Sequence, residues 1–361
     1  MSNGLEDVVA AETILSDVDG LAGRLIIRGQ PLETLAGRMT YEDMLGLLWD
    51  GFFPDLPSDL SQPLAKARLD VYRAIERELP FFADRPIYDG IRALMARLPD
   101  GTELDTALLL AAAPSVLLPA LVRLHTGKPP RVPDTSLGHA ADMLSMLGDA
   151  APAPARAAAL DAYLVTVVDH GLNASTFAAR VVASTLAGLN SSALAALGAL
   201  KGPRHGGALG PVLDMLDAIG KPENAAAWIE NELTSGRRLM GFGHRIYRVR
   251  DPRADALKAA LDRLAQSGAV DTTRIALATH VEAAALAALA RHKPGRVLAT
   301  NVEFYPALLL EALGFPRETF TAIFAASRIG GWIAHAKEEA ATGKLIRPQS
   351  RYVGPGPRQA A

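Results

Sequence analysis

Three histidines lie in segments whose residue types suit carbonyl and proton-transfer chemistry. His170 lies in D-H-G-L-N, His205 in K-G-P-R-H-G-G, and His244 in G-F-G-H-R-I-Y-R-V-R-D-P-R. A fourth segment, N-V-E-F-Y, contains the carboxylate of Glu303. Histidines can donate hydrogen bonds to a carbonyl oxygen, and a carboxylate can take a proton. The set therefore predicts polarisation of a carbonyl and removal of a carbon-bound proton, and the arginines around His244 predict an anionic substrate.

The surroundings of His205 favour a role as a hydrogen-bond donor. Gly202, Gly206 and Gly207 flank it, and glycine permits a ligand to approach the backbone closely. A helical pattern begins shortly afterwards, at Gly210. The positive end of a helix dipole favours a neutral imidazole that can donate to a developing oxyanion. On these residues alone, a loop histidine without a role remains the alternative.

The segment around His244 predicts an anion-binding loop. The D-P pair that follows is a helix-start signal and places Arg253 in the first turn of a helix. The loop Gly241–Gly243 is not a dinucleotide fingerprint, because Ile246 occupies the position of the third glycine. Glycines beside arginines suit a phosphate or a carboxylate, although a solvated basic face is the alternative.

The spacing of His170 and Asn173 has two interpretations. On a helix these residues share one face with Phe177. They could contact a ligand, or His170 could be a hydrogen-bonded core histidine, which the spacing alone favours. Four other histidines have no supporting context and are interpreted as structural: His139, His280, His292 and His335.

Composition restricts the class of protein. The chain has 361 residues, 49% of them hydrophobic and 21% charged, which predicts a globular protein of two or three domains. The net charge of −2 gives no general basic field, so we expect no nucleic-acid partner. Without cysteines there are no thiolate nucleophiles or disulfides, and no metal-binding motif such as H-E-x-x-H occurs. We expect a cytoplasmic protein, because the N-terminal residues lack the pattern of a signal peptide.

Periodicity predicts an almost all-α protein with a small N-terminal β hairpin. The hairpin is expected over Glu12–Gly29, around the turn D-V-D-G. The most apolar run, Thr106–Val122, contains two prolines and is shorter than the roughly 20 residues that span a bilayer. It therefore predicts a buried helix and no membrane association. The polar tail Gln349–Ala361 is expected to be loosely ordered. Helices are expected over Thr40–Asp50, Gln62–Leu79, Pro86–Leu98, Asp105–His125, Ser136–Leu147, Pro154–His170, Leu172–Ala187, Ser192–Leu200, Gly210–Ile219, Pro222–Gly236, Pro252–Gln266, Arg274–Arg291, Asn301–Ala312 and Arg317–Ala341.

Taken in order, these segments resemble the citrate synthase family, including its 2-methylcitrate synthase branch. The resemblance begins at G-L-E-D-V-V-A-A-E-T, takes in the four segments above and G-W-I-A-H, and closes at G-K-L-I-R-P. It implies a mainly α-helical two-domain subunit, with a large domain of residues 1–206 and 314–361 and a small domain of residues 207–313. It also implies a homodimer whose site is shared between subunits. In such a dimer the helix Asp105–His125 could lie at the subunit interface, as an alternative to burial in the core of one subunit.

The resemblance further implies the reaction and its residues. The family condenses an acyl-CoA, here acetyl-CoA or propionyl-CoA, with oxaloacetate and hydrolyses the thioester. Coenzyme A enters as the thioester substrate, and no cofactor is implied. His205 would stabilise the enolate, His244 would polarise the ketone, and Glu303 would take the α-proton. The implied binding residues are His170, Arg253, Arg328 and Arg347 for the oxo acid, with Arg347 reaching the partner subunit's site, and Gly241, Phe242, Gly243 and Arg248 for coenzyme A.

Three residues depart from the family pattern. The base is usually aspartate, and the longer Glu303 moves the carboxylate by about 1 Å, a shift that can cost on the order of 10²-fold in rate. Gly171 occupies a position that is commonly glutamate, and Arg204 replaces an apolar residue beside His205. A citryl-CoA-cleaving lyase and a non-catalytic paralogue that binds CoA or carboxylates therefore remain alternatives to a synthase.

Overall fold

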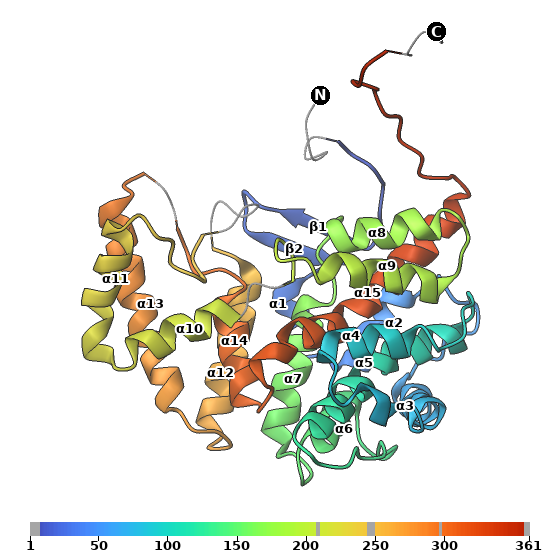
Figure 1. Cartoon of the computed structure of the whole chain (residues 1–361), viewed down its shortest axis with the longest axis horizontal. Helices are drawn as coiled ribbons and strands as arrows, with labels where there is room; N and C mark the ends of the chain where they lie inside the picture. The colour runs from blue at the N-terminus through green and yellow to red at the C-terminus, as the bar shows by residue number, and fades with distance from the viewer. Residues whose placement is uncertain (1–7, 207–209, 244–249, 296–297, 357–361) are drawn as a thin grey trace, which may run out of the picture.

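The computed structural model describes residues 8–206, 210–243, 250–295 and 298–356. Within these ranges the chain is mainly α-helical, with fifteen α-helices and one small sheet, so the predicted fold class is confirmed (Figure 1). Most predicted helices are present with bounds close to the expected ones. Tail residues 343–356 contain no helix or strand.

The N-terminal sheet has three antiparallel strands in the order β1-β2-β3. Strand β1 (Ser16–Asp19) pairs with β2 (Arg24–Ile27), and β3 (Gln30–Pro31) adds a short third strand. The predicted hairpin is confirmed, but its turn lies at residues 20–23, because most of the D-V-D-G run belongs to β1. Side chains of β2 reach the hydrophobic core, which fixes the sheet on the helical body.

Helix α5 (Leu104–His125) forms the centre of the larger group of helices. Its side chains from Leu110 to Leu121 are all buried, and it packs against α3 (Ser61–Ile75), α4 (Ile87–Met95) and α6 (His139–Leu147). Two described helices, α5 and α13, have the length and apolar composition of a membrane span, but 89% of the α5 window is buried inside the protein. The prediction of a buried core helix is therefore confirmed.

Helix α15 (Phe320–Thr342) passes through the same group and packs on α7 (Pro154–Val167), α8 (Ala174–Ala183) and α9 (Leu189–Leu200). The predicted helix ending at His170 is wrong in its last turn, because α7 ends at Val167. His170 and Asn173 therefore lie in a loop and do not share a helix face. Two more helices precede α3 in the chain: α1 (Leu32–Leu35) and α2 (Tyr41–Trp49).

The remaining helices all come from residues 210–312. Figure 1 shows α10, α11 and α13 gathered at one side of the molecule, while α12 packs against α7 and α14 packs against α12. The division into domains at residues 207 and 313 stays a prediction. The bounds of these helices are α10 (Gly210–Ile219), α11 (Ala225–Thr234), α12 (Pro252–Gln266), α13 (Thr273–His292) and α14 (Phe304–Ala312).

Candidate active site

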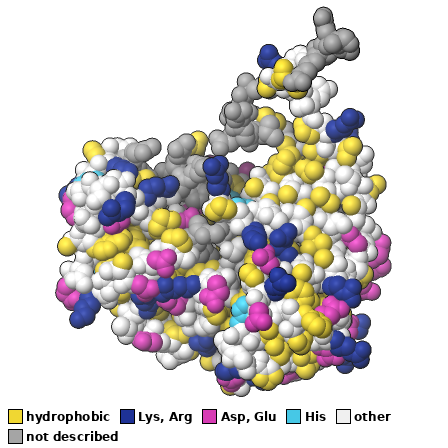
Figure 2. Space-filling model, in the orientation of Figure 1, with side chains coloured by type: hydrophobic (Ala, Val, Ile, Leu, Met, Phe, Trp, Pro, Cys, Tyr) yellow, Lys and Arg dark blue, Asp and Glu magenta, His cyan; other side chains and the backbone are white. Residues whose placement is uncertain are grey.

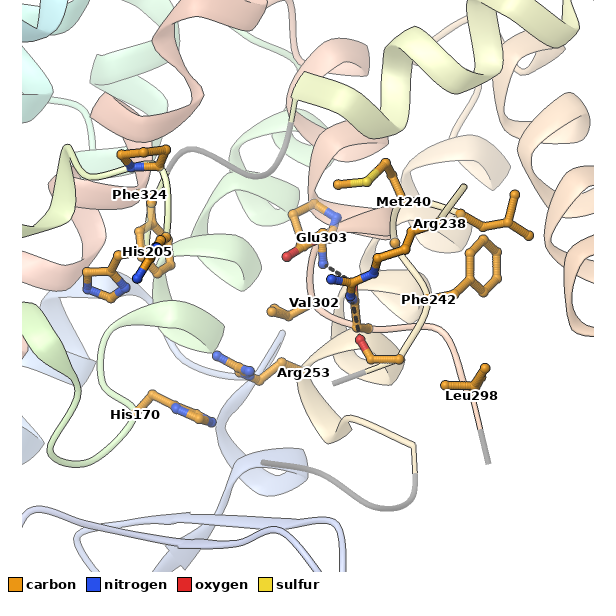
Figure 3. A pocket seen from close by; sticks show the side chains of 18 of the residues that line it. His170, His205, Arg238, Met240, Phe242, Arg253, Leu298, Val302, Glu303 and Phe324 are labelled. Carbon is orange, nitrogen blue, oxygen red and sulfur yellow. Dashed lines mark hydrogen bonds between the residues drawn. The ribbon is translucent and has the colours of Figure 1, made fainter. Parts of the chain in front are cut away.

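A cleft of about 1220 Å³ brings together most of the predicted site residues. Figure 3 shows His205 and Phe324 on one side, Glu303 and Arg238 on the other, and His170 and Arg253 below them in this view. Arg347 does not line this cleft; it is exposed beyond the end of α15. His244 and Arg248 lie outside the described residues. The predicted residues that line the cleft are His170, His205, Gly241, Phe242, Gly243, Arg253, Glu303 and Arg328.

The ring of His205 is oriented by the first turn of α8. Its Nε2 lies 2.8 Å from the hydroxyl of Ser175, which also accepts a hydrogen bond from the indole of Trp332 at 3.2 Å. The Ser175 hydroxyl also donates to the Asn173 side-chain oxygen at 2.8 Å, and that oxygen accepts two backbone N–H groups as the N-cap of α8. This network therefore fixes the orientation of the His205 ring at the first turn of α8. Sequence reasoning missed Ser175 and Trp332.

Burial keeps His205 neutral. It lowers the pKa of the imidazole from 6.5 to about 4, and the positive charge of Arg328 lowers it further in the same direction. The helix that was expected to contribute its dipole, α10, begins at Gly210 as predicted, and the contribution of that dipole to the pKa of His205 stays a prediction. A neutral imidazole at pH 7 can donate a hydrogen bond to a developing oxyanion without transferring its proton outright.

Glu303 is held at the N-terminus of α14 by Asn301. The backbone N–H of Glu303 donates to the Asn301 side-chain oxygen at 2.8 Å. The Asn301 side-chain NH₂ donates to the carbonyl of Gly243 at 2.8 Å, and its backbone N–H donates to the carbonyl of Gly241 at 2.9 Å. Asn301 therefore joins the carboxylate-bearing segment to the predicted coenzyme A loop. Its place in N-V-E-F-Y was visible in the sequence, but its role was not.

Burial also tunes Glu303. It raises the pKa of this carboxyl above the ordinary 4.5, although Asn301 and the nearby charges of Arg238 and Arg253 oppose the rise. A carboxylate with a raised pKa is a stronger base, as removal of a carbon-bound proton requires. Arg238 was not predicted as a site residue; it belongs to the arginine pair that precedes the glycine loop.

A second buried carboxylate, that of Glu282, binds residues on both sides of Glu303 in the chain. Glu282 of α13 accepts hydrogen bonds from Thr300 at 2.5 Å, from the Tyr305 hydroxyl, and from Lys258 at 3.2 Å. Burial would raise the pKa of Glu282, but these donors hold it below its ordinary value. A single glutamate in an alanine-rich helix gave no sequence signal, so sequence reasoning missed this support.

Two buried guanidinium groups face the cleft. Arg253 lies in the first turn of α12 and Asp251 is its N-cap, as the helix-start signal predicts, and the two side chains form an ion pair at 2.8 Å. Arg328 donates to the carbonyl of Val167 at 2.7 Å, and burial lowers its pKa to about 10. The charge of Arg253 lowers the pKa of Arg328 as well, which shows that the two cations lie close enough to repel one another. Such a pair attracts a dianion, and guanidinium geometry suits carboxylates.

The departures from the family pattern also have places in the structure. Gly171 has φ +58°, in the left-handed region that favours glycine, and an added Cβ would lie 3.3 Å from Val18. A glutamate would be strained there. Arg204 is exposed and lines the cleft next to His205, where it adds positive charge at the rim.

Comparison with known proteins agrees with this geometry. The family model for the C-terminal domain of citrate synthase matches residues 4–349. The chain is 38% identical to a citrate synthase of Haloferax volcanii, over 98% of this chain and 96% of that one. It is 36% identical to a 2-methylcitrate synthase of Mycobacterium tuberculosis, over 98% and 91%. The citrate synthase of Thermoplasma acidophilum, solved with carboxymethyl coenzyme A and oxaloacetate, superposes with a TM-score of 0.82 at 28% identity, covering 99% of this chain and 97% of that one. The chain belongs to the citrate synthase family, whose members condense an acyl-CoA with oxaloacetate.

Proposed function

We propose that this protein condenses acetyl-CoA or propionyl-CoA with oxaloacetate and hydrolyses the product to citrate or 2-methylcitrate and free CoA. One observation carries the proposal: a neutral, oriented histidine and a carboxylate of raised pKa line the same cleft as two buried arginines. Relatives of both activities match at similar identity, so both acyl groups are candidates. Coenzyme A acts as a thioester substrate, and the proposal requires no further cofactor.

The chemistry divides between the two walls of the cleft. Glu303 takes the α-proton of the thioester while the ring N–H of His205 donates to the thioester oxygen, which carries the developing charge. Oxyanion donors of this kind are worth roughly 10²–10³ in rate. The carbon freed of its proton then bonds to the ketone carbon of oxaloacetate, and the ketone oxygen takes up a proton. Water then cleaves the thioester and releases CoA.

The oxo acid is held at the buried cations. Arg253 and Arg328 bind its carboxylates, and His170 contacts it from the loop that follows α7. His244 polarises the ketone, and Arg248 and the Gly241–Gly243 loop contact coenzyme A. The roles of His244 and Arg248 rest on the family motifs alone, because both residues lie outside the described residues.

We extend the proposal to a homodimer in which Arg347 reaches the partner subunit's site. Arg347 is exposed and absent from its own cleft, and the adjacent Ile346 N–H donates to Ser184 at the end of α8 at 3.1 Å. Figure 2 shows hydrophobic side chains gathered over α8 and α9, and Leu186, next to this contact, is 68% exposed. An apolar surface beside the exposed tail suits contact with a second copy.

The test of the reaction is the release of free CoA thiol. We expect release from acetyl-CoA or propionyl-CoA only when oxaloacetate is present. Glu303→Gln should abolish it, while Glu33→Gln, an exposed change on α1, should not. Faster cleavage of citryl-CoA than synthesis would indicate a lyase instead. Ligand binding by calorimetry without turnover of either acyl-CoA would indicate a non-catalytic paralogue and refute the proposal.

A further inference from the structure

The segment that carries His170 is in direct contact with α15. It runs from Val167 to Gly171 and joins α7 to α8. Arg328 of α15 donates to the Val167 carbonyl at 2.7 Å. Gly331, on the same helix, lies so close that an added Cβ would be 2.5 Å from the Val168 carbonyl oxygen and 3.0 Å from a carboxylate oxygen of Asp169. The backbone on either side of His170 is therefore fixed by direct contact.

Asp169, the residue before His170, is fully buried and has a different partner on each oxygen. Its Oδ1 lies 3.2 Å from Nε2 of His335 on α15. Its Oδ2 accepts a short hydrogen bond from the hydroxyl of Ser16 on β1. The same hydroxyl oxygen accepts the backbone N–H of Gly171 at 3.0 Å. Ser16 thus bridges the two residues that flank His170, and it links this segment to the N-terminal sheet.

The tautomer of His335 is set from the other side. Its Nδ1 lies 2.8 Å from a guanidinium nitrogen of Arg180, and a guanidinium can only donate. Nδ1 therefore accepts, and the ring proton sits on Nε2, where it is donated to Asp169. Arg180 is fully buried and is itself held by Glu338 at 2.6 Å and Glu339 at 2.7 Å. The direction of each hydrogen bond in this chain of contacts is determined.

We propose that His335 is a positioning residue for the oxo-acid ligand His170, acting through Asp169 with Ser16 as the second support. This inference rests on the proposed function, because it assumes that His170 contacts oxaloacetate. His335 lies in the interior of α15, and its sequence context predicted only a structural role. Its two ring nitrogens connect Arg180 to Asp169, which belongs to the segment that positions His170. A displacement of about 1 Å at a binding group can lower the rate or the affinity substantially.

The test compares two replacements of His335 by calorimetric titration with oxaloacetate alone. His335→Gln keeps a donor for Asp169 and an acceptor for Arg180, so we expect an affinity close to that of the wild type. His335→Leu removes both, and we expect binding to weaken by about tenfold as His170 loses its placement. In steady-state assays the KM for oxaloacetate should rise with it, while the KM for acyl-CoA should not change.

Ser16→Ala provides a second measurement that does not disturb the buried ion pairs. It removes the donor to Asp169 and the acceptor for Gly171, and we expect oxaloacetate to bind about threefold to tenfold more weakly. The matched control is Ser115→Ala, which removes a buried hydroxyl from α5 whose partner is the Ala112 carbonyl. If His335→Leu does not fold, Ser16→Ala decides the question. Wild-type affinity in folded His335→Leu or in Ser16→Ala overturns the inference, whereas a wild-type protein that binds no oxaloacetate contradicts the proposed function instead.

Discussion

His205 and Glu303 are tuned in opposite directions by the same physical effect. Burial disfavours the charged form of any group, so it lowers the pKa of the imidazole to about 4 and raises the pKa of the carboxyl. Near neutral pH this leaves an uncharged hydrogen-bond donor and a carboxylate that binds protons more strongly than an exposed one. The reaction needs these two protonation states together, one to stabilise the enolate and the other to take the α-proton.

The pH dependence of the rate follows from the direction of these shifts. The base form of Glu303 is lost as the pH falls through its pKa, which lies above the ordinary 4.5. We therefore expect kcat/KM for acyl-CoA to fall on the acid side with a midpoint above 4.5. His205 gains a proton only near pH 4, so it should add no further limb between about pH 5 and pH 8.

The measurement is CoA release at subsaturating acyl-CoA across that range, with circular dichroism at each pH to confirm that the protein stays folded. A midpoint at or below 4.5 would contradict the role of a buried Glu303 as the base. A second limb near 6.5, in addition to that of Glu303, would contradict the neutral state assigned to His205.

At the scale of elements, local patterns predicted which helices form, and long-range contacts decided where the site loops begin. The predicted helix to His170 stops at Val167, because Asp169 is drawn to Ser16 and His335 and Gly171 adopts φ +58°. Those partners are more than 150 positions away in the chain, beyond the reach of helical periodicity. The D-P start of α12 was predicted correctly because Asp251 caps it locally.

The same distinction explains what was missed around Glu303. The motif N-V-E-F-Y marked the segment, but the partners of Asn301 and Glu282 come from separate parts of the chain. Only the folded structure shows that Asn301 joins the base segment to the Gly241–Gly243 loop. The family resemblance supplied roles for residues, while the contacts that orient them required the structure.

The glycine loop offers a test of this link. Gly241 has φ +83°, and an added Cβ would lie 2.9 Å from the Phe304 ring. Gly241→Ala should therefore displace the loop, raise the KM for acyl-CoA, and destabilise the fold by about 1–2 kcal/mol from the backbone conformation, with an additional cost from the ring contact. The readouts are steady-state kinetics and thermal unfolding.

Gly268→Ala is the matched control. Gly268 also has a positive φ, +72°, but an added Cβ there meets nothing within 4 Å. It should share the backbone cost and leave the KM for acyl-CoA unchanged. An equal change in KM for both variants would show that general destabilisation, and not the position of the loop, controls acyl-CoA binding.

At the scale of the whole molecule, the cleft is assembled from segments far apart in the chain. His170, His205 and Arg328 come from the larger group of helices, whereas Gly241, Arg253 and Glu303 come from residues 210–312. The cleft therefore depends on how these two groups of helices pack. Arg347 is the one predicted binding residue among those described that does not line it, and its position raises the question of a second subunit.

Mixing of two inactive variants tests whether Arg347 acts across a dimer. Arg347→Ala removes the cation from the tail, and Glu303→Gln removes the base, so each homodimer should be nearly inactive. In a mixed dimer, one site combines an intact Glu303 with an intact Arg347 from the other subunit. Random exchange should therefore restore about a quarter of the wild-type activity in an equal mixture, since half of the dimers are mixed and each has one complete site.

The alternative arrangement predicts a different result. If Arg347 served its own subunit, each site of a mixed dimer would lack either the arginine or the base, and mixing would restore nothing. Sedimentation of the wild type establishes whether a dimer is present, and co-expression of the two variants ensures that subunits exchange. Full activity of Arg347→Ala alone would remove this residue from the site altogether. Recovery near a quarter would instead mean that the exposed tail and the apolar surface over α8 and α9 complete one active site between two chains.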